Sequence, residues 1–112
     1  MKISINKIAT VTGAQDGAIY GDYLFRFSSK GGCRVYDLSK ISQGDENSEL
    51  PAIAKFTLDK ADLIVPHSNA VVFGNEFYDE CDEFPLLYSN VYNNYAKSEE
   101  KLCGYCCVYR IK

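Results

Sequence analysis

The stretch Gly31-Gly32-Cys33-Arg34-Val35-Tyr36-Asp37-Leu38 has a divergent second copy near the end of the chain, Gly104-Tyr105-Cys106-Cys107-Val108-Tyr109-Arg110-Ile111. Both copies read Cys, any residue, Val, Tyr, a charged residue and an aliphatic residue, which aligns Cys33 with Cys106 and Val35 with Val108. Two further pairs of segments precede them in the same order: apolar runs at 23–27 and 84–88, and glycine-ended segments at 18–21 and 71–74. Three matched pairs in one order indicate an internal repeat.

The apolar pattern predicts short antiparallel strands in two groups. The first group has four strands, at 18–20, 23–28, 33–38 and 52–58. The second group has three strands, at 70–73, 85–90 and 102–111. One more strand, at 2–11, precedes both groups and supplies the strand that the second group lacks.

Repeated groups of four antiparallel strands are typical of β-propeller blades. The predicted fold is therefore all-β, with residues 1–112 as one domain of two four-stranded propeller-type blades. Blade one covers about 17–58, and blade two covers about 66–112 plus the strand 2–11. Two blades cannot close a ring, so we expect either a longer propeller chain or self-association, with three copies making a six-bladed ring.

The residues of blade one resemble a known repeat. Gly21-Asp22-Tyr23-Leu24-Phe25, Gly32-Cys33-Arg34-Val35-Tyr36-Asp37-Leu38-Ser39 and Leu50-Pro51-Ala52-Ile53-Ala54-Lys55-Phe56 look like one LVIVD-type β-propeller repeat. Cys33 stands where the pattern prefers Leu, and in the second copy Arg110 replaces the Asp. The stretch from His67 to Tyr88 is similar to uncharacterised propeller-like proteins of gut bacteria. The resemblance implies a bacterial protein of this architecture and no defined activity.

Composition narrows the classes of function. The net charge is −3, and the twelve basic residues are scattered along the sequence, which argues against a nucleic-acid partner. No apolar run has the length of a membrane span. Five cysteines leave at least one thiol unpaired. This count and the lack of a signal-peptide pattern favour a cytoplasmic protein, or an exported one if a signal has been removed.

Six residues form the candidate ligand site: His67, Ser68, Asn69, Asp79, Asp82 and Glu83. His67 precedes the strand that would line a propeller's channel, where an imidazole can orient or deprotonate a ligand. Ser68 and Asn69 lie beside it, although Ser and Asn also cap ordinary turns. The acidic insert 79–83 could bind Ca²⁺ but lacks an alternating Asp loop, so a solvated surface is the alternative.

The cysteines and tyrosines support weaker hypotheses. Cys103 and Cys106 have the spacing of a zinc-site half, but in a strand they face opposite sides. Cys33 and Cys106 are therefore interpreted as small packing residues, and we expect neither a metal nor a cofactor. Tyr92, Tyr95 and Tyr105 could form a sugar-stacking surface, or could simply cover the rim of a β domain.

The leading hypothesis is a non-catalytic binding module that holds a carbohydrate or a protein at the propeller face. The alternative is a propeller hydrolase or lyase with His67 as acid or base and Asp79, Asp82 or Glu83 as its partner. A third possibility is a purely structural assembly unit. Propellers host all three, so the fold alone does not choose between them.

Overall fold

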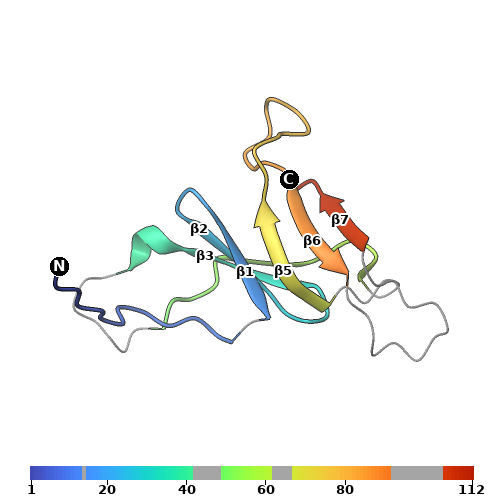
Figure 1. Ribbon diagram of the computed structural model, residues 1–112. Helices are drawn as coiled ribbons and strands as arrows, with labels where there is room; N and C mark the ends of the chain where they lie inside the picture. Colours follow the sequence, from blue (N-terminus) through green and yellow to red (C-terminus); the bar gives the residue numbers. More distant parts are fainter. Residues whose placement is uncertain (14, 42–48, 62–66, 92–104) are drawn as a thin grey trace.

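The computed structural model describes residues 1–13, 15–41, 49–61, 67–91 and 105–112. Within these ranges the chain forms two antiparallel sheets of four and three strands, as expected for an all-β protein of blade-like units (Figure 1). The sheets are not closed into a ring. No helix in the described ranges is both long and apolar enough to span a membrane.

Sheet 1 contains four strands in sequence order: β1 (Asp16–Tyr20), β2 (Tyr23–Phe27), β3 (Gly32–Asp37) and β4 (Ala54–Thr57). All four predicted strands of blade one are therefore present, with ends that differ by one or two residues. Two glycines with positive φ make the tight turns, Gly21 (φ 57°) between β1 and β2 and Gly31 (φ 81°) between β2 and β3. This left-handed region is open to glycine without steric cost. A short 3₁₀ helix, Leu38–Lys40, follows β3 and was not predicted.

Sheet 2 contains three strands: β5 (His67–Phe73), β6 (Leu87–Val91) and β7 (Tyr105–Tyr109). The predicted strands of blade two are thus confirmed; β7 ends at Tyr109, two residues before the predicted end, and residues 102–104 of that prediction lie outside the described residues. The pairing of β5 with β6 shifts register between His67 and Val71, which marks an irregularity in the ladder. In the described residues nothing pairs with the outer edge of β7.

The core lies between the two sheets. Inward side chains of sheet 1, among them Phe25 and Phe27, pack with Val71 and Leu87 of sheet 2. Aromatic rings dominate this layer: Phe25 lies 5.0 Å from Phe73 and 5.1 Å from Phe84 between ring centroids, in edge-to-face geometry. The first strands of the sheets lie next to each other, and the Val71 amide donates to Asp16 Oδ2 over 2.7 Å. The remaining two faces, the outer face of sheet 1 and the outer face of sheet 2, point away from this core.

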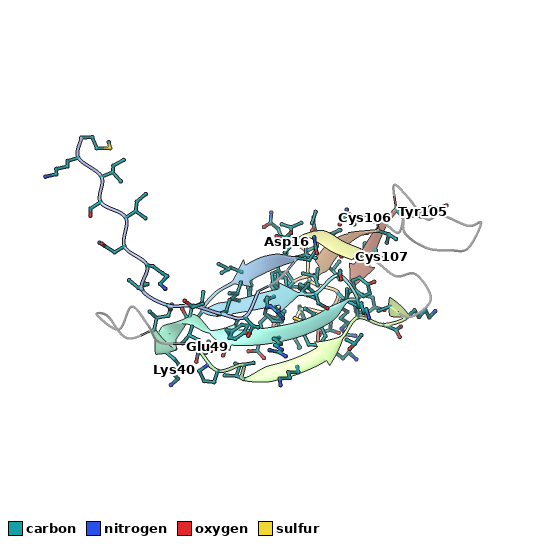
Figure 2. The ribbon with its side chains drawn as sticks, turned by 90° about the horizontal axis from the view of Figure 1, so that it is seen from below. Asp16, Lys40, Glu49, Tyr105, Cys106 and Cys107 are labelled. Atoms are coloured by element: carbon teal, nitrogen blue, oxygen red, sulfur yellow. The ribbon has the colours of Figure 1, made fainter. Side chains whose placement is uncertain are left out.

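The predicted strand 2–11 is not formed. Within the described residues, only Thr10 of this segment makes a β-bridge, to Glu49. Residues 7–9 border a groove with Leu24 and Leu38, and the residues before them extend away from the sheets (Figure 2). Ile3 and Ile5 are 73% and 91% exposed. The pattern that suggested a strand breaks at Asn6-Lys7, and a strand also needs a partner edge. Within this chain the segment does not reach β7, which lies on the far side of the molecule (Figure 1).

The repeat alignment holds for the order of the strands but fails for the direction of the last one. Val35 and Cys33 point into the core, whereas their predicted equivalents Val108 and Cys106 are exposed. In the ladders, Val35 lies opposite Phe25, and the inward residue at the matching place in sheet 2 is Cys107, opposite Ser89. The interpretation of Cys106 as a packing residue is therefore wrong, because a shift of one residue moves a side chain to the other face of a sheet.

Candidate functional site

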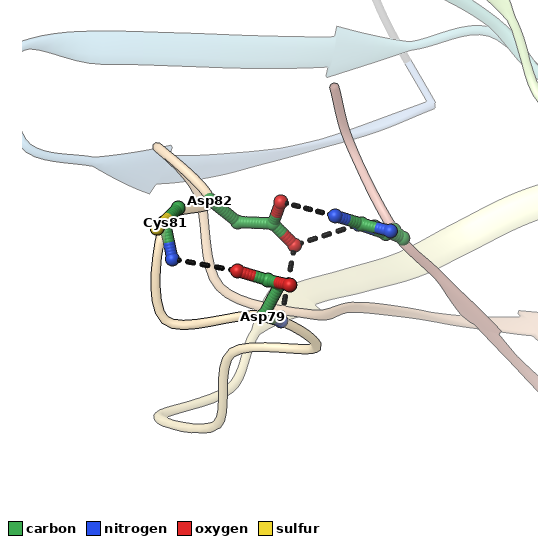
Figure 3. A network of polar contacts seen from close by, with 4 residues as sticks. Asp79, Cys81 and Asp82 are labelled. Atoms are coloured by element: carbon green, nitrogen blue, oxygen red, sulfur yellow. Dashed lines mark hydrogen bonds and ion pairs between the residues drawn. The ribbon is translucent and has the colours of Figure 1, made fainter.

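The acidic insert between β5 and β6 folds as a tight turn (Figure 3). The Asp79 carboxylate accepts the Cys81 amide over 2.9 Å, and the Asp79 carbonyl accepts the Asp82 amide over 3.0 Å. These are the hydrogen bonds of an Asx-type turn, for which a short acidic side chain is favoured. One of the two predicted aspartates thus has a local structural role.

Asp82 is held by Arg110, which follows β7. The guanidinium donates Nε to Oδ2 over 2.7 Å and Nη2 to Oδ1 over 2.6 Å, a bidentate ion pair that joins the insert to the end of the chain. The Arg110 guanidinium also lies 4.6 Å above the Tyr78 ring centroid. The Asp82 side chain is only 8% exposed. The hydrogen bonds from Arg110 hold the pKa of Asp82 below its usual value, and Asp82 in turn raises the pKa of Arg110.

A carboxylate with these partners is poorly suited to proton transfer or cation binding, because its charge is already neutralised. Glu83, the third acidic residue of the predicted site, is exposed. In the part of the chain that the structure describes, no three His, Cys, Asp or Glu side chains gather to form a metal site. The insert therefore functions in the structure as a fastened loop.

The predicted His67 group lies elsewhere. His67, Ser68 and Asn69 begin β5, with His67 opposite Val91, and their side chains lie outside the described residues. The acidic insert follows the other end of β5 (Figure 1). At about 3.3 Å per residue, the length of this strand puts about 20 Å between His67 and the start of the insert. The backbone of β5 thus separates the two halves of the predicted site, and the hydrolase or lyase alternative stays a prediction.

An open groove of about 290 Å³ lies between β4 and the residues that follow β7. Its lining includes Phe56, Leu58, Tyr109 and Ile111. Burial, together with the neighbouring Cys107 thiol, raises the pKa of the Tyr109 hydroxyl, which makes no hydrogen bond of acceptable geometry with any described residue. Thr57, Asp59 and Lys112 add polar groups to this lining.

Two surface features were not predicted from the sequence. The first is the apolar row Val72–Tyr88–Val108, which crosses β5, β6 and β7 on the outer face of sheet 2, with Val72 59% and Val108 53% exposed. The second, which we call the basic row, is Arg26–Arg34–Lys55 on the outer face of sheet 1. Arg26 and Arg34 are separated by a single turn. The other neighbours within each row lie at least 16 residues apart in sequence, and the register of the strands brings them side by side.

Comparison of the chain with protein-family models, with curated proteins and with solved structures finds no match in any of the three. The resemblance to LVIVD-type propeller repeats accordingly stays a prediction. Function has to be argued from the edges and faces of the two sheets.

Proposed function

We propose that this chain is a non-catalytic assembly module whose protein partner is a second copy of itself. In this arrangement residues 2–9 of one copy add a fourth strand to the β7 edge of sheet 2 in the next copy. The observation that carries the proposal is a mismatch among the described residues: sheet 2 has one strand fewer than sheet 1, and an extended N-terminal segment of alternating polar and apolar residues forms no strand.

The β7 edge is suited to this role. An edge strand presents a row of unpaired backbone N–H and C=O groups, and an extended peptide can satisfy them by strand addition. Tyr105 and Val108 on this strand are 60% and 53% exposed. Pairing would cover part of these side chains as well as the backbone.

The N-terminal segment has the length and pattern of a strand. Residues 2–9 would span about 26 Å when extended, more than the five residues of β7 require. Ile3 and Ile5 lie on one side of such a strand and Ser4 and Asn6 on the other. Burial of the two isoleucines contributes about 1.5–3 kcal/mol each. This gain must offset the conformational entropy that the segment loses when it becomes ordered.

The geometry favours head-to-tail association. The N-terminal segment leaves the molecule on the side opposite β7 (Figure 1). One copy can therefore donate its N-terminal segment to one neighbour and accept, at its β7 edge, the segment of another neighbour. Such heterologous contacts close into rings when the rotation permits. Three copies, with six sheets, are the closed form that we propose.

Light scattering during size exclusion, over a hundredfold range of protein concentration, tests the proposal. We expect a mass three times that of the protomer for the wild type. The double variant Ile3→Asp/Ile5→Asp should be monomeric, because it places charges on the apolar side of the added strand. The matched control Ser4→Asp/Asn6→Asp adds the same charge on the other side and should retain assembly. A wild-type monomer at every concentration, or equal loss of mass in both double variants, would contradict the proposal.

A further inference from the structure

The basic row brings three cations together across three adjacent strands. Arg26 on β2 lies directly opposite Arg34 on β3, and Arg34 lies directly opposite Lys55 on β4. Cβ atoms of directly opposed residues are about 5 Å apart, and like charges at such positions are destabilising. A protein with net charge −3 has enough acidic residues to neutralise such a row, so its composition does not account for the arrangement.

No carboxylate neutralises the basic row within the described residues, where the only ion pair joins Arg110 to Asp82. Glu49 borders a neighbouring groove with Arg34 and Lys55 but forms no ion pair with either. Arg34 instead donates to the neutral Thr12 hydroxyl over 3.4 Å. The Arg26 Nε is buried and has no hydrogen-bond partner among the described groups. A buried charged donor without an acceptor is costly, which points to an acceptor that arrives from solution.

A hollow of about 360 Å³ adjoins the basic row, and Arg26, Arg34 and Lys55 line it together with Ser28 and Gly32. Ser28 Oγ accepts the Gly32 amide over 3.2 Å, which leaves the hydroxyl proton able to donate to a ligand. The fourth position of the row, on β1, is Gly17, opposite Arg26; it adds no side chain of its own, and the neighbouring Leu24 side chain lies over it. The site thus combines two guanidinium groups, an ammonium group and a hydroxyl donor around open space.

We propose that this hollow binds a tetrahedral oxyanion, a phosphate or sulfate group, with Arg26 and Arg34 as the principal donors. Planar guanidinium groups match two oxygens of such an anion at once, and Lys55 adds a third charge from the edge strand. The anion would also remove the repulsion within the row. This site is independent of the proposed strand addition, which involves the β7 edge on the other sheet.

Titration calorimetry in Hepes buffer tests the site, with sodium phosphate and sodium sulfate as probes and sodium chloride at matched ionic strength as the reference. We expect saturable binding of either oxyanion that weakens as sodium chloride rises. Arg34→Gln should weaken phosphate binding at least about tenfold, as expected for a charge-assisted hydrogen bond. Lys55→Gln should weaken it about fivefold, since an exposed ion pair contributes less. Lys40→Gln, which removes an exposed lysine outside the row, should leave binding unchanged.

A second readout separates binding from a structural role. In buffer free of oxyanion, Lys55→Gln should raise Tm slightly because it relieves repulsion, and it should reduce the Tm increase that phosphate gives the wild type. Lys55 lies on an edge strand, so we expect Lys55→Gln to fold; its phosphate affinity then tests the site even if Arg34→Gln fails to fold. Phenyl phosphate as a third probe distinguishes two kinds of ligand. Tighter binding of phenyl phosphate than of inorganic phosphate would indicate a phosphate ester of a larger ligand, and weaker binding would indicate the free ion. No saturable binding of any probe, or equal weakening by Lys40→Gln and Arg34→Gln, would overturn the proposal.

Discussion

Sheet 1 and sheet 2 are built from aligned copies of one sequence pattern, yet they point the shared valine in opposite directions. In sheet 1, Val35 faces Phe25 in the core and is 6% exposed; in sheet 2, Val108 faces Tyr88 on the outer face and is 53% exposed. The strand that carries the motif pairs correctly in both sheets. The difference shows that two copies of a repeat can keep the same order of strands while the motif strand of one copy, here β7, shifts its pairing register by one residue.

The slip also changes what each sheet leaves open. Sheet 1 buries Cys33 and Val35 and presents charged side chains outward, whereas sheet 2 presents Val72, Tyr88 and Val108 outward and ends at the unpaired β7. One sheet is thus suited to a polar ligand, and the other to a protein surface. Four predictions test this comparison, beginning with the largest expected effect.

The two aligned cysteines should differ most in reactivity. Burial raises the pKa of the Cys33 thiol to about 12, while Cys106 is exposed. Only the thiolate is nucleophilic, so at pH 8 a pKa near 12 leaves a thiolate fraction of about 10⁻⁴. A pulse of iodoacetamide followed by peptide mass spectrometry should label Cys106 at least about a thousandfold faster than Cys33. In denaturant the two rates should converge. Native rates within tenfold of each other would restore the original repeat alignment.

The aligned valines should differ in their effect on folding. Val35→Asp buries a charge without a partner and should lower the free energy of unfolding by about 3–5 kcal/mol. Val108→Asp should change it by about 0.5 kcal/mol or less at a concentration where the protein is monomeric. Urea unfolding of both variants measures this. If the two variants were equally destabilised in the monomer, the outward position of Val108 would be wrong.

Much of the fold was predictable because hairpin chemistry is local. Glycine turns and period-two apolar patterns located all seven described strands. In β2 this alternation puts Phe25 and Phe27 on one face, and the structure shows that this face is the inward one. The strand at 2–11 failed for a different reason. Alternation shows that a segment can form a strand, but the existence of a free edge within reach depends on tertiary structure. The direction of Val108 failed because motif matching carries no information about pairing register.

The candidate site was harder to predict than the fold. Asp82 was predicted as a ligand residue, whereas the structure pairs it with Arg110, which lies 28 residues away in sequence and is brought close by the end of β7. The basic row was missed because a count of scattered cations ignores register. The signal was nevertheless present: given the turn at Gly31, hairpin pairing of β2 with β3 fixes Arg26 opposite Arg34.

The aligned glycines Gly21 and Gly74 should respond oppositely to the same substitutions. Gly21 has a φ of +57° and open space around it, whereas a Cβ at Gly74 would lie 2.6 Å from Tyr88 Cε2. Gly21→Ala should cost about 1 kcal/mol and Gly21→Asn less, because Asn tolerates the left-handed conformation. Gly74→Ala should cost about 1–3 kcal/mol by displacing the Tyr88 ring, and Gly74→Asn should cost more. Thermal unfolding of the four variants measures these effects. We expect Asn to be tolerated better than Ala at Gly21 and worse than Ala at Gly74; the same rank order at both sites would contradict the prediction.

The smallest effect concerns the aligned positions Asp37 and Arg110, which lie after Val35 and Val108. Asp37 is satisfied locally, because Ser39 donates to it and lowers its pKa; Arg110 instead forms the long-range pair that lowers the pKa of Asp82. A carboxyl group with a lowered pKa in the folded state contributes stability that is present above the unfolded value, about pH 4, and is lost as pH falls through the folded pKa.

Asp82→Asn should therefore lower Tm modestly at pH 7, and the difference from the wild type should shrink below about pH 4 as the wild-type Asp82 becomes protonated. Glu83→Gln, which changes an exposed carboxylate of the same insert, should leave Tm unchanged at both pH values. Thermal unfolding between pH 2 and pH 7 measures both variants, and a difference for Asp82→Asn that persists at pH 2 would mean that the insert is fastened by packing and not by the charge of the pair.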